Sequence, residues 1–396
     1  MVLSKFFAIF GSWPSLSAAE LYHLNIISPT NSKLGQDFVI FEGQVDIAKL
    51  PSQSGGVVKS GQIIFDGTPT SSELVSFLLD TMKIENKIYL GFSSYPAKTS
   101  KQKKKSLFAI GIELKRRLKE RGYKVRLVES RDGNLSSVVV EKNKLTSQTG
   151  VEFVYLKTDK KIYVGKTVAV QPFDKLSQRD YGRPERDDRS GMLPPKLAQI
   201  MINLNGPDKT GILLDPFCGS GTILQEALLI GWKKVVGTDK SEKAAASTQN
   251  NINWLIKKFG LDDIKVRIMA IDVRNLPDIF DQNYFSAVAT EPFLGSPHLT
   301  KPQAPSVKQQ LFSLYLSAYK SLGRIIKPGG RIVMVWPVIF GNYLPLQNKI
   351  VELGFRPVAP LPPEWEKTYH LNKRGNLEYG RIGQKIKREI TIWQKK

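Results

Sequence analysis

The pattern of apolar and polar residues divides the chain into two halves. Up to about residue 165, short runs rich in β-branched and aromatic residues alternate with amphipathic stretches, which predicts a mixed α+β half. Its clearest helices are expected over residues 74–82 and 107–121, because apolar residues recur there every three to four positions. Strands are expected over residues 5–10, 37–41, 62–65, 87–91, 124–128, 136–140, 151–156 and 161–166.

From Leu193 onward, apolar strands and amphipathic helices alternate regularly. This alternation is typical of an α/β domain with a parallel, doubly wound sheet. The expected strands are residues 212–214, 234–237, 264–271, 285–290 and 331–336, and the expected helices are residues 222–230, 241–259 and 307–326. Residues 173–189 are polar and densely charged, so we expect a linker there.

Length and composition narrow the class of protein. A chain of 396 residues is expected to hold two or three domains, and 41 % hydrophobic residues supply ordinary cores. One cysteine and three scattered histidines argue against a disulfide framework and against a metal site. No apolar run approaches the roughly 20 residues that span a bilayer, so we expect a soluble protein without membrane contact. The single cysteine favours a reducing, cytoplasmic location.

A glycine-containing loop stands between the first strand and the first helix of the second half. It reads Asp215-Pro216-Phe217-Cys218-Gly219-Ser220-Gly221-Thr222. Glycines at this place let the backbone approach a ligand closely, beside the N-terminus of a helix. A glycine-rich turn that binds nothing is the alternative for the two glycines taken alone.

Three acids at strand ends favour a ligand. Asp215, Asp239 and Asp272 follow the first, second and third strands, and these ends converge on one cleft in a doubly wound sheet. The P-loop signature and the third glycine of the dinucleotide fingerprint are absent. S-adenosylmethionine fits best, since it offers an ammonium group, a ribose diol and an adenine amine to the acids and carries no phosphate.

These segments resemble a known family. The loop from Asp215 to Thr222 is similar to the first methyltransferase motif of the THUMP-containing tRNA guanosine N2-methyltransferases, of the archaeal and eukaryotic guanosine-10 type. The stretch from Gly191 to Ala198 resembles the segment that opens their catalytic domain. Weaker similarity to their ferredoxin-like and THUMP regions runs through residues 6–21, 135–140 and 179–184.

The resemblance implies a domain order and a cofactor pocket. It implies a ferredoxin-like domain over residues 1–70, a THUMP-like RNA-binding domain over 71–166, a linker over 167–190 and a Rossmann-like methyltransferase domain over 191–396. The expected pocket residues are Asp215, Phe217, Gly219, Ser220, Gly221, Asp239 and Asp272. Cys218 belongs to this loop and not to the substrate side, so methylation of pyrimidine C5 through a thiolate is not expected.

The expected catalytic residues follow the fourth strand. The family carries Asp/Asn-Pro-Pro-Tyr/Phe there, whereas this chain has Glu291-Pro292-Phe293-Leu294. In one interpretation Glu291 and the Pro292 carbonyl accept the hydrogens of a base amine, and Phe293 stacks on the base. In the other, the pocket is degenerate and the domain only binds. Intact cofactor acids favour the first.

Positive charge is concentrated in two segments. The formal net charge is +22, and twelve lysines and arginines against two glutamates lie between Lys98 and Arg126. Such a concentration is typical of phosphate binding, although a solvated helix face is the alternative. The expected RNA-binding residues are Lys101, Lys103, Lys104, Lys105, Arg116, Arg117 and Arg121. A second basic patch is expected from Arg381, Lys385, Lys387, Arg388, Lys395 and Lys396.

The sequence therefore predicts an RNA methyltransferase that uses S-adenosylmethionine, with N2-methylguanosine in tRNA as its product. Ribosomal RNA is the alternative substrate. Two other functions stay open: an RNA-binding protein with a vestigial methyltransferase domain, and a dinucleotide-dependent oxidoreductase, which the missing third glycine disfavours.

Overall fold

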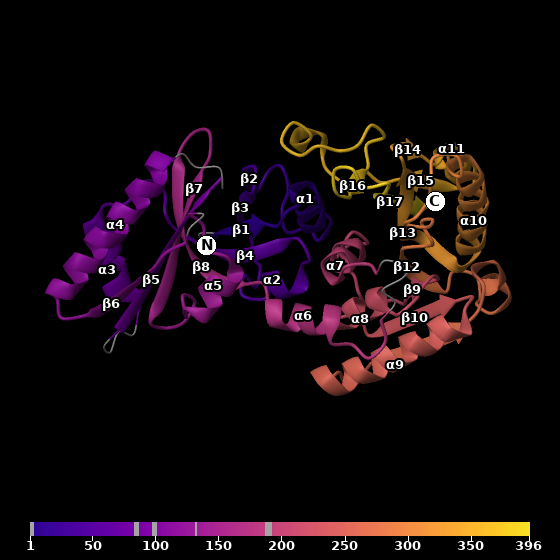
Figure 1. The fold of residues 1–396 in the computed structure, drawn as a ribbon, viewed down its shortest axis with the longest axis horizontal. Helices are drawn as coiled ribbons and strands as arrows, with labels where there is room; N and C mark the ends of the chain where they lie inside the picture. Colours follow the sequence, from indigo (N-terminus) through magenta and orange to yellow (C-terminus); the bar gives the residue numbers. More distant parts are fainter. Residues whose placement is uncertain (1–3, 83–86, 97–100, 131–132, 187–191) are drawn as a thin grey trace.

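Two β-sheets, one in each half of the chain, form the framework of the molecule (Figure 1). The computed structural model describes residues 4–82, 87–96, 101–130, 133–186 and 192–396, and the side chains of residues 101–106 are outside this description. Within the described residues, no helix is long and apolar enough to cross a membrane. The predicted fold class, an α+β half followed by a doubly wound α/β half, is confirmed.

The N-terminal half is built on one eight-stranded sheet in the order β2-β3-β1-β4-β8-β7-β5-β6. Its strands are β1 (Lys5–Phe10), β2 (Ser32–Leu34), β3 (Phe38–Glu42), β4 (Val57–Phe65), β5 (Lys87–Tyr95), β6 (Lys124–Val128), β7 (Gly150–Lys157) and β8 (Ile162–Val170). Its helices are α1 (Pro14–His23), α2 (Leu50–Gln53), α3 (Ser71–Thr81), α4 (Lys101–Glu120), α5 (Ser137–Lys142) and α6 (Phe173–Tyr181).

A buried polar row ties the centre of this sheet together. Glu152 on β7 accepts hydrogen bonds from Lys59 on β4, Thr167 on β8 and Ser93 on β5, at 2.5, 2.6 and 2.6 Å. The four residues are almost fully buried and lie on four adjacent strands. The segments expected as separate domains over residues 1–70 and 71–166 therefore share one continuous sheet.

Two expected elements differ in kind. The strand expected over residues 136–140 is helix α5, because the Ser136 hydroxyl accepts a hydrogen bond from the Val139 backbone and caps a helix. The stretch expected as a linker over residues 167–190 begins with the end of β8 and continues as helix α6. Helix α6 is held by a buried ion pair in which Arg179 donates to both carboxylate oxygens of Glu226 on α8, at 2.6 and 3.0 Å.

The C-terminal sheet has the order β11-β10-β9-β12-β13-β17-β15, in which β9 to β13 are parallel and β17 is antiparallel to both of its neighbours. Its main strands are β9 (Leu213–Asp215), β10 (Lys234–Asp239), β11 (Lys265–Ala270), β12 (Phe285–Thr290), β13 (Ile326–Ile339), β15 (Phe355–Pro357) and β17 (Ile386–Lys395). Two short strands, β14 (Asn342–Tyr343) and β16 (Leu377–Tyr379), pair with β13 and β17.

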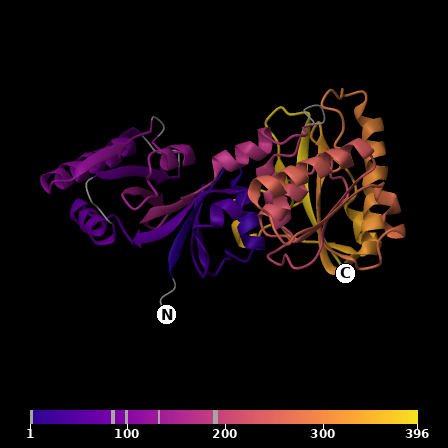
Figure 2. The same ribbon diagram turned by 90° about the horizontal axis from the view of Figure 1, so that it is seen from below.

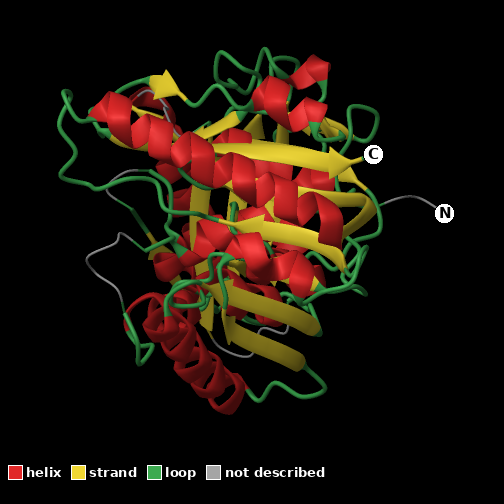
Figure 3. Ribbon diagram, turned by 90° about the vertical axis from the view of Figure 1, so that its right-hand side faces the viewer, coloured by secondary structure: helices red, strands yellow, loops and turns green. Residues whose placement is uncertain are grey.

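Helices cover both faces of the C-terminal sheet, one of which is turned toward the viewer in Figure 3. One layer contains α7 (Pro195–Asn203), α8 (Thr222–Leu229) and α9 (Glu242–Phe259). The other contains α10 (Ala304–Ile325), α11 (Gln347–Glu352) and the 3-10 helix η1 (Val273–Asp278). A second 3-10 helix, η2 (Pro363–Trp365), lies in the segment that leads to β16.

The two halves share one hydrophobic core at their junction, where α1 packs against α7 (Figures 1 and 2). Glu20 on α1 is fully buried there. Its carboxylate accepts hydrogen bonds at 2.8 Å from the Ser54 hydroxyl, the Gly55 and Gly56 backbone amides and the Asn203 side chain on α7. The C-terminal segment also returns to the first half, since the Tyr369 hydroxyl donates to the Gly35 carbonyl at 2.8 Å.

We predict that Glu20→Ala lowers the free energy of unfolding by about 3–5 kcal/mol, because four buried donors lose their acceptor. Urea denaturation at neutral pH measures the change. Glu366→Ala is the matched control, since Glu366 is exposed on the C-terminal segment, and we expect a change within about 0.5 kcal/mol. Equal effects of the two substitutions would contradict the role of Glu20 in holding the two halves together.

Candidate active site

The order of the C-terminal sheet places a crevice beside β9. The chain proceeds from β9 to β10 and β11 on one side and then crosses to β12 on the other, so the direction of winding reverses between β9 and β12. Ligands of doubly wound sheets bind at such a switch point, outside the carboxyl ends of the strands. Asp215 ends β9, Asp239 ends β10 and Glu291 follows β12, so three acids lie at this edge.

Asp215 occupies the switch point itself. Its side chain is buried and accepts hydrogen bonds from the Thr290 hydroxyl at 2.7 Å and from the Phe217 backbone amide at 3.2 Å. Burial above all, together with the neighbouring carboxylates Asp239 and Glu291, raises the pKa of Asp215 to about 7 against the lowering effect of these hydrogen bonds. A cation bound at this edge would therefore stabilise the ionised form of Asp215.

The two glycines of the loop have a left-handed backbone conformation. Gly219 and Gly221 have φ values of +53° and +83°, in the left-handed region that favours glycine. A Cβ on Gly219 would meet nothing within 4 Å, so the backbone there is open to a ligand, whereas a Cβ on Gly221 would lie 2.9 Å from Thr248. Ser220 lies between them, partly exposed, and Phe217 is partly buried against the core beside α10.

Two polar residues of α9 hold this loop. The Thr248 hydroxyl donates to the Gly219 carbonyl at 2.8 Å, and the Asn251 amide donates to the Ser220 carbonyl at 2.8 Å. Both are fully buried and share a face of α9 with Ile252 and Leu255. Sequence analysis missed them, although polar residues one turn apart on an otherwise apolar helix face are a detectable signal.

Asp239 and Asp272 differ in their availability. The partly exposed Asp239 carboxylate accepts from the Gly219 and Ser241 backbone amides at 3.2 and 3.0 Å, so it is fixed at the rim of the loop. Asp272 is engaged by Arg274, which donates to both of its carboxylate oxygens at 2.9 and 2.8 Å. This ion pair holds the pKa of Asp272 below its usual value. An adenine amine would therefore share Asp272 with a guanidinium that the sequence did not identify as its partner.

Glu291 has an arginine partner. Arg388 on β17 donates to both Glu291 carboxylate oxygens, at 2.5 and 2.9 Å, and only 13 % and 12 % of the two side chains is exposed. The sequence analysis placed Arg388 in a basic surface patch and left Glu291 free to accept from a base. The expectation for Arg388 is corrected: the two side chains form a largely buried pair, because β17 runs antiparallel and returns Arg388 to the edge where β12 ends. The role of Glu291 as an acceptor for a base amine stays a prediction.

The two residues after Glu291 point in different ways. Pro292 is buried, and Phe293 is 60 % exposed, so its ring is available to an incoming group. The Phe293 carbonyl accepts a hydrogen bond from the Tyr315 hydroxyl on α10 at 3.3 Å. Tyr315 is fully buried, and burial raises its pKa well above the usual value, so it remains a neutral donor.

Among the basic residues expected to bind RNA, Lys101, Lys103, Lys104 and Lys105 have side chains outside the described part of the chain. Arg116 forms ion pairs with Glu113 and Glu120, and Arg117 with Glu113, all along α4. Arg121 is exposed at the end of the same helix. Exposed ion pairs of this kind contribute little to stability.

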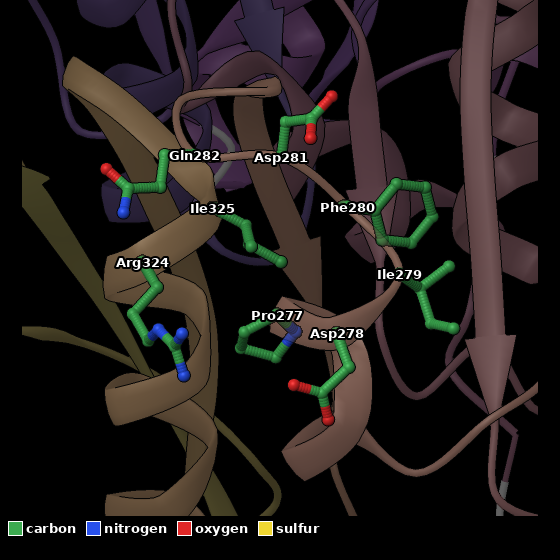
Figure 4. A pocket seen from close by; sticks show the side chains of 8 residues that line it. All are labelled: Pro277, Asp278, Ile279, Phe280, Asp281, Gln282, Arg324 and Ile325. Carbon is green, nitrogen blue, oxygen red and sulfur yellow. The ribbon is translucent and has the colours of Figure 1, made fainter.

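A pocket of about 250 Å³ lies away from this edge (Figure 4). It is lined by Pro277 to Gln282, Arg324 and Ile325, beside the starts of β12 and β13, and contains no predicted site residue.

Cys218 is buried next to Thr248, and burial raises the pKa of its thiol, which agrees with a packing role. No group of three His, Cys, Asp or Glu side chains within the described ranges is placed to hold a metal ion.

Comparison with known proteins identifies the kind of domain that carries this edge. Residues 183–338 match the family model described as RMKL-like, methyltransferase domain. The chain is 34 % identical over 163 residues to a tRNA (guanine(10)-N2)-dimethyltransferase of Methanothermobacter thermautotrophicus, a match that covers 41 % of this chain and 42 % of the relative. The corresponding protein of Pyrococcus abyssi is 30 % identical over 42 % of this chain and 43 % of its own length.

Two further comparisons are more distant. A tRNA (guanine(6)-N2)-methyltransferase of Thermus thermophilus is 28 % identical over 39 % of this chain and 43 % of its own length. The crystal structure of TrmN from Thermus thermophilus covers 99 % of both chains with a TM-score of 0.49 and 16 % identity. The matches to the curated relatives thus span about two fifths of their length. The predicted resemblance is confirmed as an RMKL-like methyltransferase domain with distant similarity to tRNA guanine-N2 methyltransferases.

The raised pKa of Asp215 predicts a pH dependence of stability. A carboxyl group whose pKa is higher in the folded than in the unfolded chain binds more protons when folded. The ordinary pKa of an aspartate is 3.8 and that of Asp215 in the folded protein is about 7, so stability falls as the pH rises through this range. Between pH 5 and 7.5, we expect the free energy of unfolding of the ligand-free protein to fall by about 2–3 kcal/mol more than that of Asp215→Asn.

Denaturant titrations of the two proteins at both pH values measure this difference. The comparison cancels the other buried carboxyl groups, Glu20 and Glu226, whose pKa values burial also raises. Parallel pH profiles of the two proteins would show that Asp215 titrates as an ordinary exposed acid.

Proposed function

We propose that this chain is an S-adenosylmethionine-dependent RNA methyltransferase that forms N2-methylguanosine in tRNA. The observation that carries the proposal is the convergence of Asp215, Asp239 and Glu291 on the switch point of a methyltransferase-type sheet, beside a glycine loop with open space above Gly219. The names of the relatives support guanine N2 as the target atom and tRNA as the substrate.

The residues at the edge fit S-adenosylmethionine. Asp215, buried beside two other acids, favours an ammonium group; Asp239 keeps lone pairs for a ribose diol; the Gly219 backbone is open to close approach. A phosphate would meet carboxylates here, which disfavours nucleotide and dinucleotide cofactors. When bound, S-adenosylmethionine supplies a methyl group on a positively charged sulfur that an amine takes by in-line displacement.

Glu291, Pro292 and Phe293 provide the substrate side. A guanine amine must lose conjugation with its ring as its nitrogen becomes a nucleophile, and acceptors for its two hydrogens promote this change. The Arg388 guanidinium donates one hydrogen bond to each Glu291 oxygen, so each oxygen keeps a second lone pair for an N–H donor. The Pro292 carbonyl is the second acceptor, and the exposed Phe293 ring stacks on the flipped base. The released proton leaves through Glu291 to solvent.

The N-terminal half provides the RNA contact in this proposal, as a ferredoxin-like and THUMP-like region. Arg121, Lys119 and the Arg116 and Arg117 pairs line α4, and the exposed apolar residues Phe108 and Ile112 lie on the same helix. Cations beside exposed apolar groups suit a polynucleotide, which offers phosphates and bases together. The shared core at Glu20 keeps this surface at a set distance from Glu291, and that distance selects the nucleotide.

A specific observation favours a second candidate function. Both Glu291 oxygens are already bound by Arg388, and the motif departs from the family in its acid and in its second proline. In this second candidate the chain binds structured RNA, and also the methyl donor, without transferring the methyl group. The two candidates agree on binding and differ only in the product.

We expect incubation with radiolabelled S-adenosylmethionine and unmodified tRNA transcripts to place label in N2-methylguanosine. Nucleoside analysis by mass spectrometry identifies the product and separates mono- from dimethylation. Ribosomal RNA fragments under the same conditions test the alternative substrate. Binding of tRNA and of the methyl donor without label in any RNA would reject the enzyme and support the second candidate.

A cofactor-site variant tests the pocket. We expect Asp239→Ala to weaken S-adenosylmethionine binding at least about 30-fold, because charge-assisted hydrogen bonds to a carboxylate contribute about 2 kcal/mol or more. Affinity for tRNA remains unchanged, since Asp239 lies in the cleft and not on α4. Calorimetry and gel-shift titration measure the two affinities. Asp278→Ala, at the distant pocket of Figure 4, is the control and keeps both; donor binding that survives in Asp239→Ala would refute this pocket.

A further inference from the structure

We propose that Arg388 is a positioning residue for methyl transfer: it holds the Glu291 carboxylate, across one intervening strand, in the orientation that receives the substrate amine. The inference rests on the proposed function, and it adds a residue that lies outside the segment matched by the family model, which ends at residue 338. It follows from the span, the burial and the surroundings of the Glu291–Arg388 pair.

The span of the pair explains its residue types. Glu291 follows β12 and Arg388 lies on β17, and β13 runs between these two strands. Adjacent strands are about 4.8 Å apart, so the two side chains bridge about 10 Å of sheet. Two long side chains meet at 2.5 and 2.9 Å, whereas an aspartate would stop about one bond short. The glutamate that departs from the family motif is therefore matched by an arginine two strands away in the sheet.

Two aromatic residues support the Arg388 side chain. The Arg388 guanidinium lies 5.9 Å from the centre of the Tyr379 ring on β16, which pairs with β17 at this position. The centres of the Tyr379 and Trp13 rings are 5.0 Å apart, and Trp13 immediately precedes α1. The aromatic contact that supports Arg388 therefore includes a residue of the N-terminal half. A bidentate fork fixes the plane of a carboxylate, which a single contact does not. The second lone pairs of the Glu291 oxygens are thereby aimed in set directions.

The same strand carries a second pair that serves as a control. Glu389, the next residue on β17, is fully buried and accepts hydrogen bonds from Arg374, Asn372 and Asn376. Successive residues of a strand point to opposite faces, so this pair faces away from Glu291. Arg374→Gln therefore measures what the loss of a buried ion pair on β17 costs the protein without disturbing Glu291.

The experiment measures single-turnover methyl transfer to tRNA, per bound S-adenosylmethionine, for the unmodified protein and for Arg388→Gln, Arg388→Lys, Glu291→Gln, the double variant Glu291→Gln/Arg388→Gln and Arg374→Gln. We expect Arg388→Gln to lower the rate at saturation at least about tenfold while the Kd for the donor and the KM for tRNA stay within twofold. Arg388→Lys keeps the charge without the fork and recovers part of the rate, and it replaces Arg388→Gln if that variant does not fold.

The double variant separates positioning from general support. If Arg388 acts through Glu291, the double variant is as slow as Glu291→Gln alone, because the carboxylate that Arg388 orients is already absent. Multiplied losses in the double variant, or equal rates for Arg388→Gln and Arg374→Gln, would overturn the inference. A faster Arg388→Gln would overturn it too and make Arg388 a competitor of the substrate. Absence of transfer by the unmodified protein rejects the proposed function itself, a result that no pattern among the variants can imitate.

Discussion

The burial of Glu20 at the junction of the two halves is the constraint on which the rest of the arrangement depends. A carboxylate without solvent requires a full set of donors, and here these come from the α2–β4 connection and from Asn203 on α7. The three segments therefore meet at this carboxylate. The hydrophobic core around this carboxylate is continuous between the halves, so α1 and α7 pack within one core.

The candidate site is assembled from distant parts of the chain. The switch point brings Asp215 and Thr290 into contact, α9 supports the glycine loop, and β17 returns Arg388 to Glu291. Three acids at one edge repel one another, and the protein manages this in different ways. Burial raises the pKa of Asp215, backbone amides satisfy Asp239, and a guanidinium neutralises Glu291. In the proposed function, this edge offers negative charge to a cationic ligand and an oriented carboxylate to a neutral amine.

Much of this organisation could be predicted from sequence. The strands and helices of the C-terminal half lie close to their expected positions, because buried parallel strands and amphipathic helices leave strong periodic signals. Glycines at 219 and 221 indicated a loop whose backbone a ligand can approach closely, and the structure gives both glycines a left-handed conformation. The errors fell where local signals compete: Val138 to Val140 look like a strand until the cap at Ser136 is considered, and the charged segment after Val170 looks like a linker until Arg179 meets Glu226.

The sequence by itself determined the fold class, the strand ends that carry the acids and the loop that faces them, because each depends on spacing along a single element or between neighbouring ones. Only the tertiary structure decided which charges are free. Arg388 and Glu291 are 97 residues apart, Arg179 and Glu226 are 47 apart, and Glu20 and Asn203 are 183 apart. A count of charges along the sequence does not distinguish these charged residues from exposed ones. Burial makes them partners, because an ionised side chain removed from water requires an opposite charge or a set of hydrogen bonds, and the fold alone determines which groups are near enough to provide them.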